Sequence, residues 1–206
     1  MVHTGEEGWS AIETKCFLPS SGIAWAIMLL LTVVPNGVVF MAPPCSDWTW
    51  LNSYTSGRYL SEFGHVGHPG VKASNTVATA VSMLMWMCHM RGLYYMVEQP
   101  KDSSMFKFPA MASMIEMTNG SKLLTYQGPF GAAIPKPTVL LHNMGDELTA
   151  SLVKPSPPRG SMKANVCWTS NAGVFKGTSD LKATEHYPTS FAQELANVAA
   201  RAVGLV

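Results

Sequence analysis

Apolar positions along the chain fall into runs of two lengths. Runs of strand length cover residues 38–42, 93–97, 122–127 and 138–143. Patterns of helix length cover residues 22–34, 73–92, 109–117 and 190–203. Helices and strands therefore follow one another for most of the chain, which favours an α/β sheet that is mostly parallel and covered on both faces. We predict a Rossmann-like three-layer sandwich, in which the last two strands form an antiparallel hairpin across a short Gly/Pro loop.

Residues with turn and capping preferences set the expected boundaries of these elements. Pro35-Asn36-Gly37 separates the first helix from the first strand. Asn75 is the expected N-cap of the second helix, and Arg91-Gly92 is its expected C-terminal stop. The second strand is expected to finish before Glu98-Gln99-Pro100.

The pattern divides the chain into four segments. Residues 1–21 are expected to be weakly structured, and residues 22–143 to form the α/β domain. Residues 144–185 are rich in Pro, Ser and Gly and show little periodicity, so we expect an irregular segment there. Residues 186–206 carry the last helix, which is expected to pack on the domain. With 206 residues, the chain is long enough for one domain with a sizeable core.

Composition narrows the range of partners. Charged residues make up 13% of the chain and the net charge is +1, so no overall field points to a nucleic-acid or membrane partner. The four cysteines form no C-x-x-C pair, which argues against a zinc site and favours a reduced, intracellular setting, nuclear or cytoplasmic. His65 and His68 lie in a Gly-rich loop with no third ligand nearby, so we expect no metal there.

One apolar stretch, residues 22–44, is long enough to be weighed as a membrane span. Pro35-Asn36-Gly37 interrupts it, and no cluster of Lys or Arg flanks it. We therefore expect a buried helix, a turn and a strand, with no membrane partner.

Two of the expected strand ends carry reactive or polar residues. Pro43-Pro44-Cys45 follows the first strand, and Glu98-Gln99-Pro100 follows the second. Ligands of open α/β sheets bind at the carboxyl ends of the strands, so the Cys45 thiol and the Glu98 carboxylate would face one cleft if these strands are neighbours. The prolines fix φ and remove backbone donors, which would make the turn a stiff mount for a nucleophile.

Three segments follow one another in a definite order: APPC at 42–45, EQP at 98–100 and YQGPFGAAIPKPTVLLHN at 126–143. Their order and strand-end placement resemble the DNA (cytosine-5)-methyltransferase family. That family carries a Pro-Cys nucleophile after an apolar strand, an E-N-V or E-N-P motif one strand later, and then a Gly-rich hairpin. HYPTSFAQELANVAARA at 186–202 is more loosely similar to the closing helix of such proteins.

The resemblance implies a role for each of these residues. Cys45 would be the thiolate that attacks C6 of a flipped cytosine of DNA, and Glu98 would contact the N3 side of the ring. Lys136 would lie near a phosphate, and S-adenosylmethionine would be the methyl donor. The substrate-binding residues that the motifs imply are Pro43, Pro44, Gln99, Pro100 and Lys136.

The chain departs from the family pattern in three ways. Residues 1–21 hold no strand with the F-x-G-x-G loop that binds the donor in the family. Gln99 stands where the family usually has Asn, and the Q-x-R-x-R segment of the family is reduced to Lys136. We therefore expect a methyltransferase-like domain that is incomplete at its N-terminus and inactive alone.

Other interpretations stay open. A non-catalytic interaction or scaffold domain, as in a mobile-element protein, would keep the α/β scaffold without a donor pocket. A hydrolase with Cys45 as nucleophile would need a histidine partner, and no histidine lies in a recognisable motif. Cys45 is alternatively an inert cysteine, and Lys136 a solvated loop residue. Trp48 and Trp50 are expected to cover the sheet, although such side chains also stack on bases.

Overall fold

The computed structural model describes residues 20–158, 167–169, 175–177 and 186–205. The expectation for residues 1–21 therefore lies almost wholly outside the described residues, and that for 144–185 lies partly outside them. The helices are α1 Ser20–Thr32, α2 Ser53–Ser56, α3 Pro69–Met90, α4 Pro109–Met117, α5 Asp146–Thr149 and α7 Thr189–Ala202. The strands are β1 Val38–Met41, β2 Tyr94–Pro100, β3 Ser121–Tyr126, β4 Pro137–His142, β5 Cys167–Thr169 and β6 Phe175–Gly177. Short 3-10 helices cover Ser46–Trp48, Trp50–Asn52, Ser104–Lys107, Gly128–Phe130 and Ala150–Leu152.

The main sheet is mixed, with the strand order β1-β2-β4-β3. β1 and β2 are parallel, whereas β4 is antiparallel to both β2 and β3. The expectation of a mostly parallel sheet is therefore wrong, because only one of these pairings is parallel. The reason lies in the connections: the β3–β4 hairpin reverses the chain and returns β4 into the space between β2 and β3. The antiparallel hairpin itself is confirmed, and β1 and β2, the strands that carry the two motifs, are parallel neighbours.

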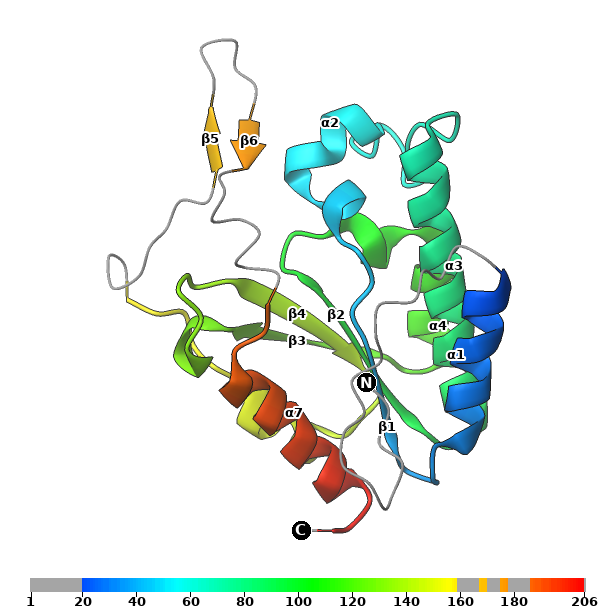
Figure 1. Ribbon diagram of the computed structural model, residues 1–206, viewed down its shortest axis with the longest axis vertical. Helices are drawn as coiled ribbons and strands as arrows, with labels where there is room; N and C mark the ends of the chain where they lie inside the picture. Colours follow the sequence, from blue (N-terminus) through cyan, green and yellow to red (C-terminus); the bar gives the residue numbers. More distant parts are fainter. Residues whose placement is uncertain (1–19, 159–166, 170–174, 178–185, 206) are drawn as a thin grey trace.

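Helices cover both faces of this sheet. α1, α3 and α4 lie on one face, and α7 lies on the other (Figure 1). The alternation of side chains along β2 explains how one strand serves both layers. Tyr95 and Val97 pack toward α3 and α4, whereas Met96 packs toward α7.

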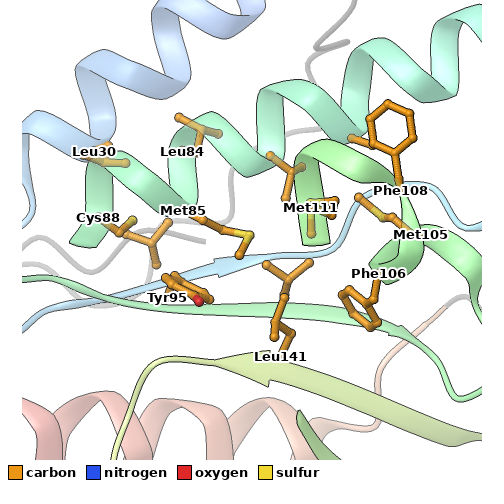
Figure 2. Close-up of a cluster of buried hydrophobic side chains, with 14 of the residues drawn as sticks. Leu30, Leu84, Met85, Cys88, Tyr95, Met105, Phe106, Phe108, Met111 and Leu141 are labelled. Atoms are coloured by element: carbon orange, nitrogen blue, oxygen red, sulfur yellow. The ribbon is translucent and has the colours of Figure 1, made fainter. Parts of the chain in front are cut away.

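The larger core lies between the sheet and the helices α1, α3 and α4. Figure 2 shows Met85 and Cys88 of α3 and Met111 of α4 above Tyr95 and Leu141 of the sheet. All five side chains are buried. The Met-rich run in α3 thus fills the core, as flexible, unbranched side chains do where packing is irregular.

The second core lies between the other face of the sheet and α7. Met96 and Leu140 of the sheet pack with Phe130 of the β3–β4 connection and with Phe191 and Val198 of α7. α7 therefore packs on the α/β domain, and its observed span agrees closely with the helix expected over 190–203.

α3 begins six residues before the expected N-cap. His68 is the N-cap: its Nδ1 accepts a hydrogen bond from the Gly70 amide, 3.2 Å away, and Pro69 occupies the first turn. Proline is favoured at that position because its missing N–H would have no helical partner there. Asn75 instead lies inside the helix, where its Oδ1 accepts from Arg58. The expected stop at Arg91 is confirmed.

The apolar stretch 22–44 forms a helix, a turn and a strand. α1 ends at Thr32, and Asn36 adopts a positive φ of 61° in the turn that leads to β1. Asparagine tolerates this left-handed conformation better than most residues. Among the described ranges, no helix is long and apolar enough to cross a membrane.

Candidate functional site

The two predicted motifs leave neighbouring parallel strands at the same edge of the sheet. Met41, the last residue of β1, is in register with Val97 of β2. The APPC segment leaves the sheet directly after Met41, and Glu98 directly follows Val97. β2, however, continues to Pro100, so the Glu98-Gln99-Pro100 motif lies inside the strand and not after it. The antiparallel partner β4 extends the strand, because it pairs with all three motif residues.

Glu98 is a buried carboxyl on the α7 face of the sheet. It is 7% exposed, and its Oε2 accepts a hydrogen bond of 3.0 Å from the Tyr187 hydroxyl. Burial raises the pKa of Glu98 above its ordinary value, and the charge of Lys136 and the Tyr187 hydrogen bond oppose that rise only in part. The carboxyl therefore keeps its proton to a higher pH than a solvated glutamate.

Tyr187 is the residue around which the candidate groups gather. The Nζ of Lys136 lies 4.8 Å from the centroid of its ring, and the Phe40 ring meets it edge-on at 6.0 Å. Burial, the Glu98 carboxylate and the Cys45 thiolate all raise the pKa of Tyr187. Cys45 therefore lies within electrostatic reach of the phenol whose hydroxyl donates to Glu98 and whose ring the Lys136 ammonium faces.

Gln99 lies on the opposite face and plays a different part. It is fully buried, its Nε2 donates to the Pro43 carbonyl at 2.8 Å, and its Oε1 accepts from Ser103 at 2.8 Å. Successive residues of a strand point to opposite faces, so Gln99 cannot share the Glu98 side of the sheet. It ties the turn after β1 to β2.

The remaining motif residues lie at the margins of this site. Pro43 is half-buried and Pro44 exposed in the turn that leads to Cys45, which is itself half-buried. Pro100 ends β2 opposite Thr138. Lys136 is half-buried at the end of the β3–β4 connection and has a positive φ of 39°. Its ammonium lies over the Tyr187 ring, so the side chain packs on the site and is not simply surrounded by solvent.

The two tryptophans after Cys45 differ in burial. Trp48 is buried, with the Arg58 guanidinium 3.3 Å from its ring centroid and the Phe108 ring edge-on to it. It packs in the core cluster that also holds Val97 and Leu141 of the sheet, in agreement with the expectation that it covers the sheet. Trp50 is exposed, so the expectation that it covers the sheet is not met.

The described residues offer neither a metal site nor a glycine-rich donor loop after β1 or β2. Across the described part of the chain, no cluster of three or more His, Cys, Asp or Glu side chains could hold a metal ion. A nucleotide-like donor is ordinarily cradled by a glycine-rich turn between a strand and a helix. The connections that leave β1 and β2 begin instead with Ala42-Pro43-Pro44 and with Lys101-Asp102. These two connections do not fit S-adenosylmethionine.

No protein-family model, curated protein or solved structure matches the chain.

Tyr187 is the residue of the site that sequence reasoning did not single out. It lies 89 positions after Glu98 and directly before the proline that precedes α7. The Tyr-Pro pair before an amphipathic helix was the available signal. That signal locates a helix start, but it does not say which strand residue the tyrosine meets.

Proposed function

We propose that the chain is a DNA cytosine-5 methyltransferase-like domain whose Cys45 and Glu98 act on a cytosine ring. The observation that carries this proposal is that Glu98 accepts a hydrogen bond from Tyr187 and that Cys45 lies within electrostatic reach of the same phenol. The two motifs also lie on or directly after the adjacent parallel strands β1 and β2, where Met41 is in register with Val97. The mixed sheet would then belong to a larger Rossmann-like sandwich. Such a domain would work inside the cell, in the nucleus or the cytoplasm.

The chemistry begins with addition of the Cys45 thiolate to C6 of cytosine. The C5–C6 double bond opens, and its electron pair moves onto C5 and, by conjugation, toward N3. A protonated Glu98 carboxyl donates a hydrogen bond to N3 and stabilises the charge that develops there. C5 then takes a proton from water. Loss of the original C5 hydrogen as a proton, followed by expulsion of the thiolate, restores cytosine with a solvent hydrogen at C5.

The burial of Glu98 supports its role as the acid. A carboxyl whose pKa is raised by burial stays protonated nearer to neutral pH, and only a protonated carboxyl can donate to N3. The half-buried Cys45 is accessible enough to meet a base that has been turned out of the stack.

The described residues offer groups for activating the base and for contacting DNA, but the connections after β1 and β2 offer no site for the methyl donor. S-adenosylmethionine would supply the methyl group, and its site would have to come from outside the two connections described above. Lys136, beside Glu98, would meet the phosphate or the ring oxygen of the extruded nucleotide. The described residues therefore account for activation of the base, and this step can be tested without a donor.

The test is release of tritium from DNA that carries 5-³H-cytosine, with no methyl donor present. We expect slow release by the wild-type chain and no release above background by Cys45→Ser or Glu98→Gln. Cys88→Ala is the matched control, because Cys88 is buried in the core on the opposite face of the sheet. Equal release by wild type and Cys45→Ser, or no release by wild type on single-stranded and double-stranded DNA, would reject the proposal.

A second candidate, an interaction domain, is favoured by the edge of the sheet. Among the described strands, β1 pairs with β2 alone, and α1 beside it exposes Met28 and Leu31. Open strand edges and apolar surface promote pairing with another chain. Light scattering across a concentration series tests this: a concentration-dependent rise in mass that Met28→Lys abolishes would favour the interaction domain.

A further inference from the structure

The contacts of Tyr187 extend in three directions from one side chain. Its hydroxyl donates to Glu98, and the Lys136 ammonium lies over its ring. The Phe40 ring packs against the Tyr187 ring in a T-shaped arrangement. Phe191 of α7 packs at 5.7 Å from the same ring. Tyr187, which lies just before α7, thus contacts two of the three candidate groups, Glu98 and Lys136.

We propose that Tyr187 is the positioning residue of the site: its hydroxyl fixes one oxygen of Glu98, and its ring holds the ammonium of Lys136 beside that carboxyl. The catalytic consequence of this inference rests on the proposed function. The contacts of Tyr187 with Glu98 and Lys136 do not depend on any reaction. It also assigns α7 a task beyond covering the sheet, because the helix carries Tyr187 at its entry.

The hydrogen bond gives Glu98 a defined orientation. A carboxyl in a buried site can otherwise rotate to satisfy either oxygen, and a donor that holds Oε2 leaves Oε1 for a ligand. Tyr187 can only serve as a donor here while it keeps its proton. Burial, Glu98 and Cys45 all raise the pKa of Tyr187, so the phenol stays protonated at neutral pH.

The ring contact gives Lys136 a defined place. Lysine has a long, flexible side chain, and attraction to an aromatic face confines its ammonium. Lys136 also has a positive φ, a conformation that non-glycine residues keep only when their surroundings fix it. Both observations agree with a lysine held in one position at the end of the hairpin.

The deciding experiment is the titration of Glu98, followed through the side-chain carboxyl carbon in a chain labelled with ¹³C-glutamate and assigned by loss of the signal in Glu98→Gln. Tyr187→Phe removes a hydrogen bond that favours the carboxylate, so the Glu98 midpoint should move to a higher pH. Tyr94→Phe is the matched control: it removes the same oxygen four residues earlier on the same face of β2, and should leave the midpoint unchanged. Coincident Glu98 titrations in wild type and Tyr187→Phe would overturn the proposal.

A second pair of variants tests the ring without relying on the hydroxyl. Lys136→Met should raise the Glu98 midpoint in the wild-type background and in Tyr187→Phe, which keeps the ring. In Tyr187→Leu the same lysine substitution should have little further effect, because the ring that confines the ammonium is gone. A Lys136 effect of equal size in Tyr187→Leu would overturn the ring's part.

The tritium assay then separates this inference from the proposed function. Where wild type releases tritium, Tyr187→Phe should lower kcat by about tenfold to a hundredfold with KM changed by less than about twofold, because the Glu98 carboxyl that donates to N3 loses the contact that fixes its orientation. An unchanged kcat would overturn the proposal. Where wild type releases none, the proposed function fails, and the Glu98 titration still decides the role of Tyr187.

Discussion

The side-chain amide of Gln99 donates a 2.8 Å hydrogen bond to the backbone carbonyl of Pro43 and fastens the turn after β1 to the neighbouring strand. This contact explains why the chain follows a buried strand with two prolines. The prolines limit the conformations of the turn, and Gln99 anchors it from the α3 side of the sheet. Cys45 therefore lies two residues beyond an anchored carbonyl.

Replacing Gln99 should loosen this anchor. Gln99→Ala removes the donor to Pro43 and the acceptor for Ser103 from a side chain that is fully buried, and both partners are half-buried. We expect the free energy of unfolding in urea to fall by about 1–3 kcal/mol. Gln193→Ala on the exposed face of α7 is the control, and should change it by less than about 0.5 kcal/mol. Equal stability of Gln99→Ala and wild type would contradict the anchoring role.

The two cysteines with described side chains should differ sharply in reactivity. Cys45 is half-buried at the site, whereas Cys88 is fully buried and its pKa is raised to about 12 by burial. Because only the thiolate reacts, iodoacetamide at neutral pH should modify Cys45 and leave Cys88 intact in the native chain. Peptide mapping by mass spectrometry measures both sites, and urea should expose Cys88. Labelling of Cys88 at the rate of Cys45 without urea would show that the core is open.

Arg58 should be the most costly single residue to remove from the loop after Cys45. Its guanidinium donates to the backbone carbonyls of Asp47 and Glu62 and to the side chains of Ser74 and Asn75, so it joins this loop to α3. Arg58→Met should lower the free energy of unfolding by about 3 kcal/mol, since it removes four part-buried hydrogen bonds of a buried guanidinium at once. Arg58→Lys should recover only part of the loss, because an ammonium lacks the planar fork.

A surface arginine provides the comparison for Arg58. Arg201 pairs with Glu194 at 3.2 Å on a partly exposed face of α7. Arg201→Met should therefore cost about 1 kcal/mol or less. If both arginine substitutions cost the same in urea unfolding, the loop does not depend on the buried guanidinium.

Local signals in the sequence predicted most helices, strands and turns correctly. They failed where a residue far away in the sequence determines the role of a side chain. The turn at Asn36, the stop at Arg91 and the β3–β4 hairpin all follow from short-range preferences, and the structure confirms them. Asn75 has the capping preference expected of an N-cap, but Arg58 engages its side chain from 17 positions away. The true signal was Pro69, one residue after the N-cap His68.

The strand order of the sheet and the geometry of the site likewise depend on contacts between residues far apart in the sequence. Parallel strands were expected from helix–strand alternation, but nothing local says that β1 and β2 are neighbours or that β4 enters between β2 and β3. The sequence predicted that Cys45 and Glu98 follow two strands, and that they would face one cleft if those strands are neighbours. It could not show that Gln99 faces away from Glu98, or that the Tyr187 hydroxyl donates to Glu98, because both depend on strand register and on the docking of α7.

The burial of Glu98 predicts a definite pH dependence of stability. Its pKa is raised in the folded chain above the ordinary value of 4.5, so the folded state holds a proton that the unfolded state releases as the pH rises. The free energy of unfolding should therefore be greatest below about pH 4.5, as far as this group is concerned, and decline as the pH rises through the folded pKa. Glu98→Gln keeps an acceptor for Tyr187 but cannot ionise, so its advantage over wild type should grow with pH across this range. Urea unfolding at several pH values measures the difference, with Glu147→Gln at an exposed position as the control that removes a carboxylate without removing a buried one. A constant difference between Glu98→Gln and wild type from pH 4 to 8 would mean that Glu98 is as well solvated in the folded chain as in the unfolded one, and the acid role proposed for it would lose its physical basis.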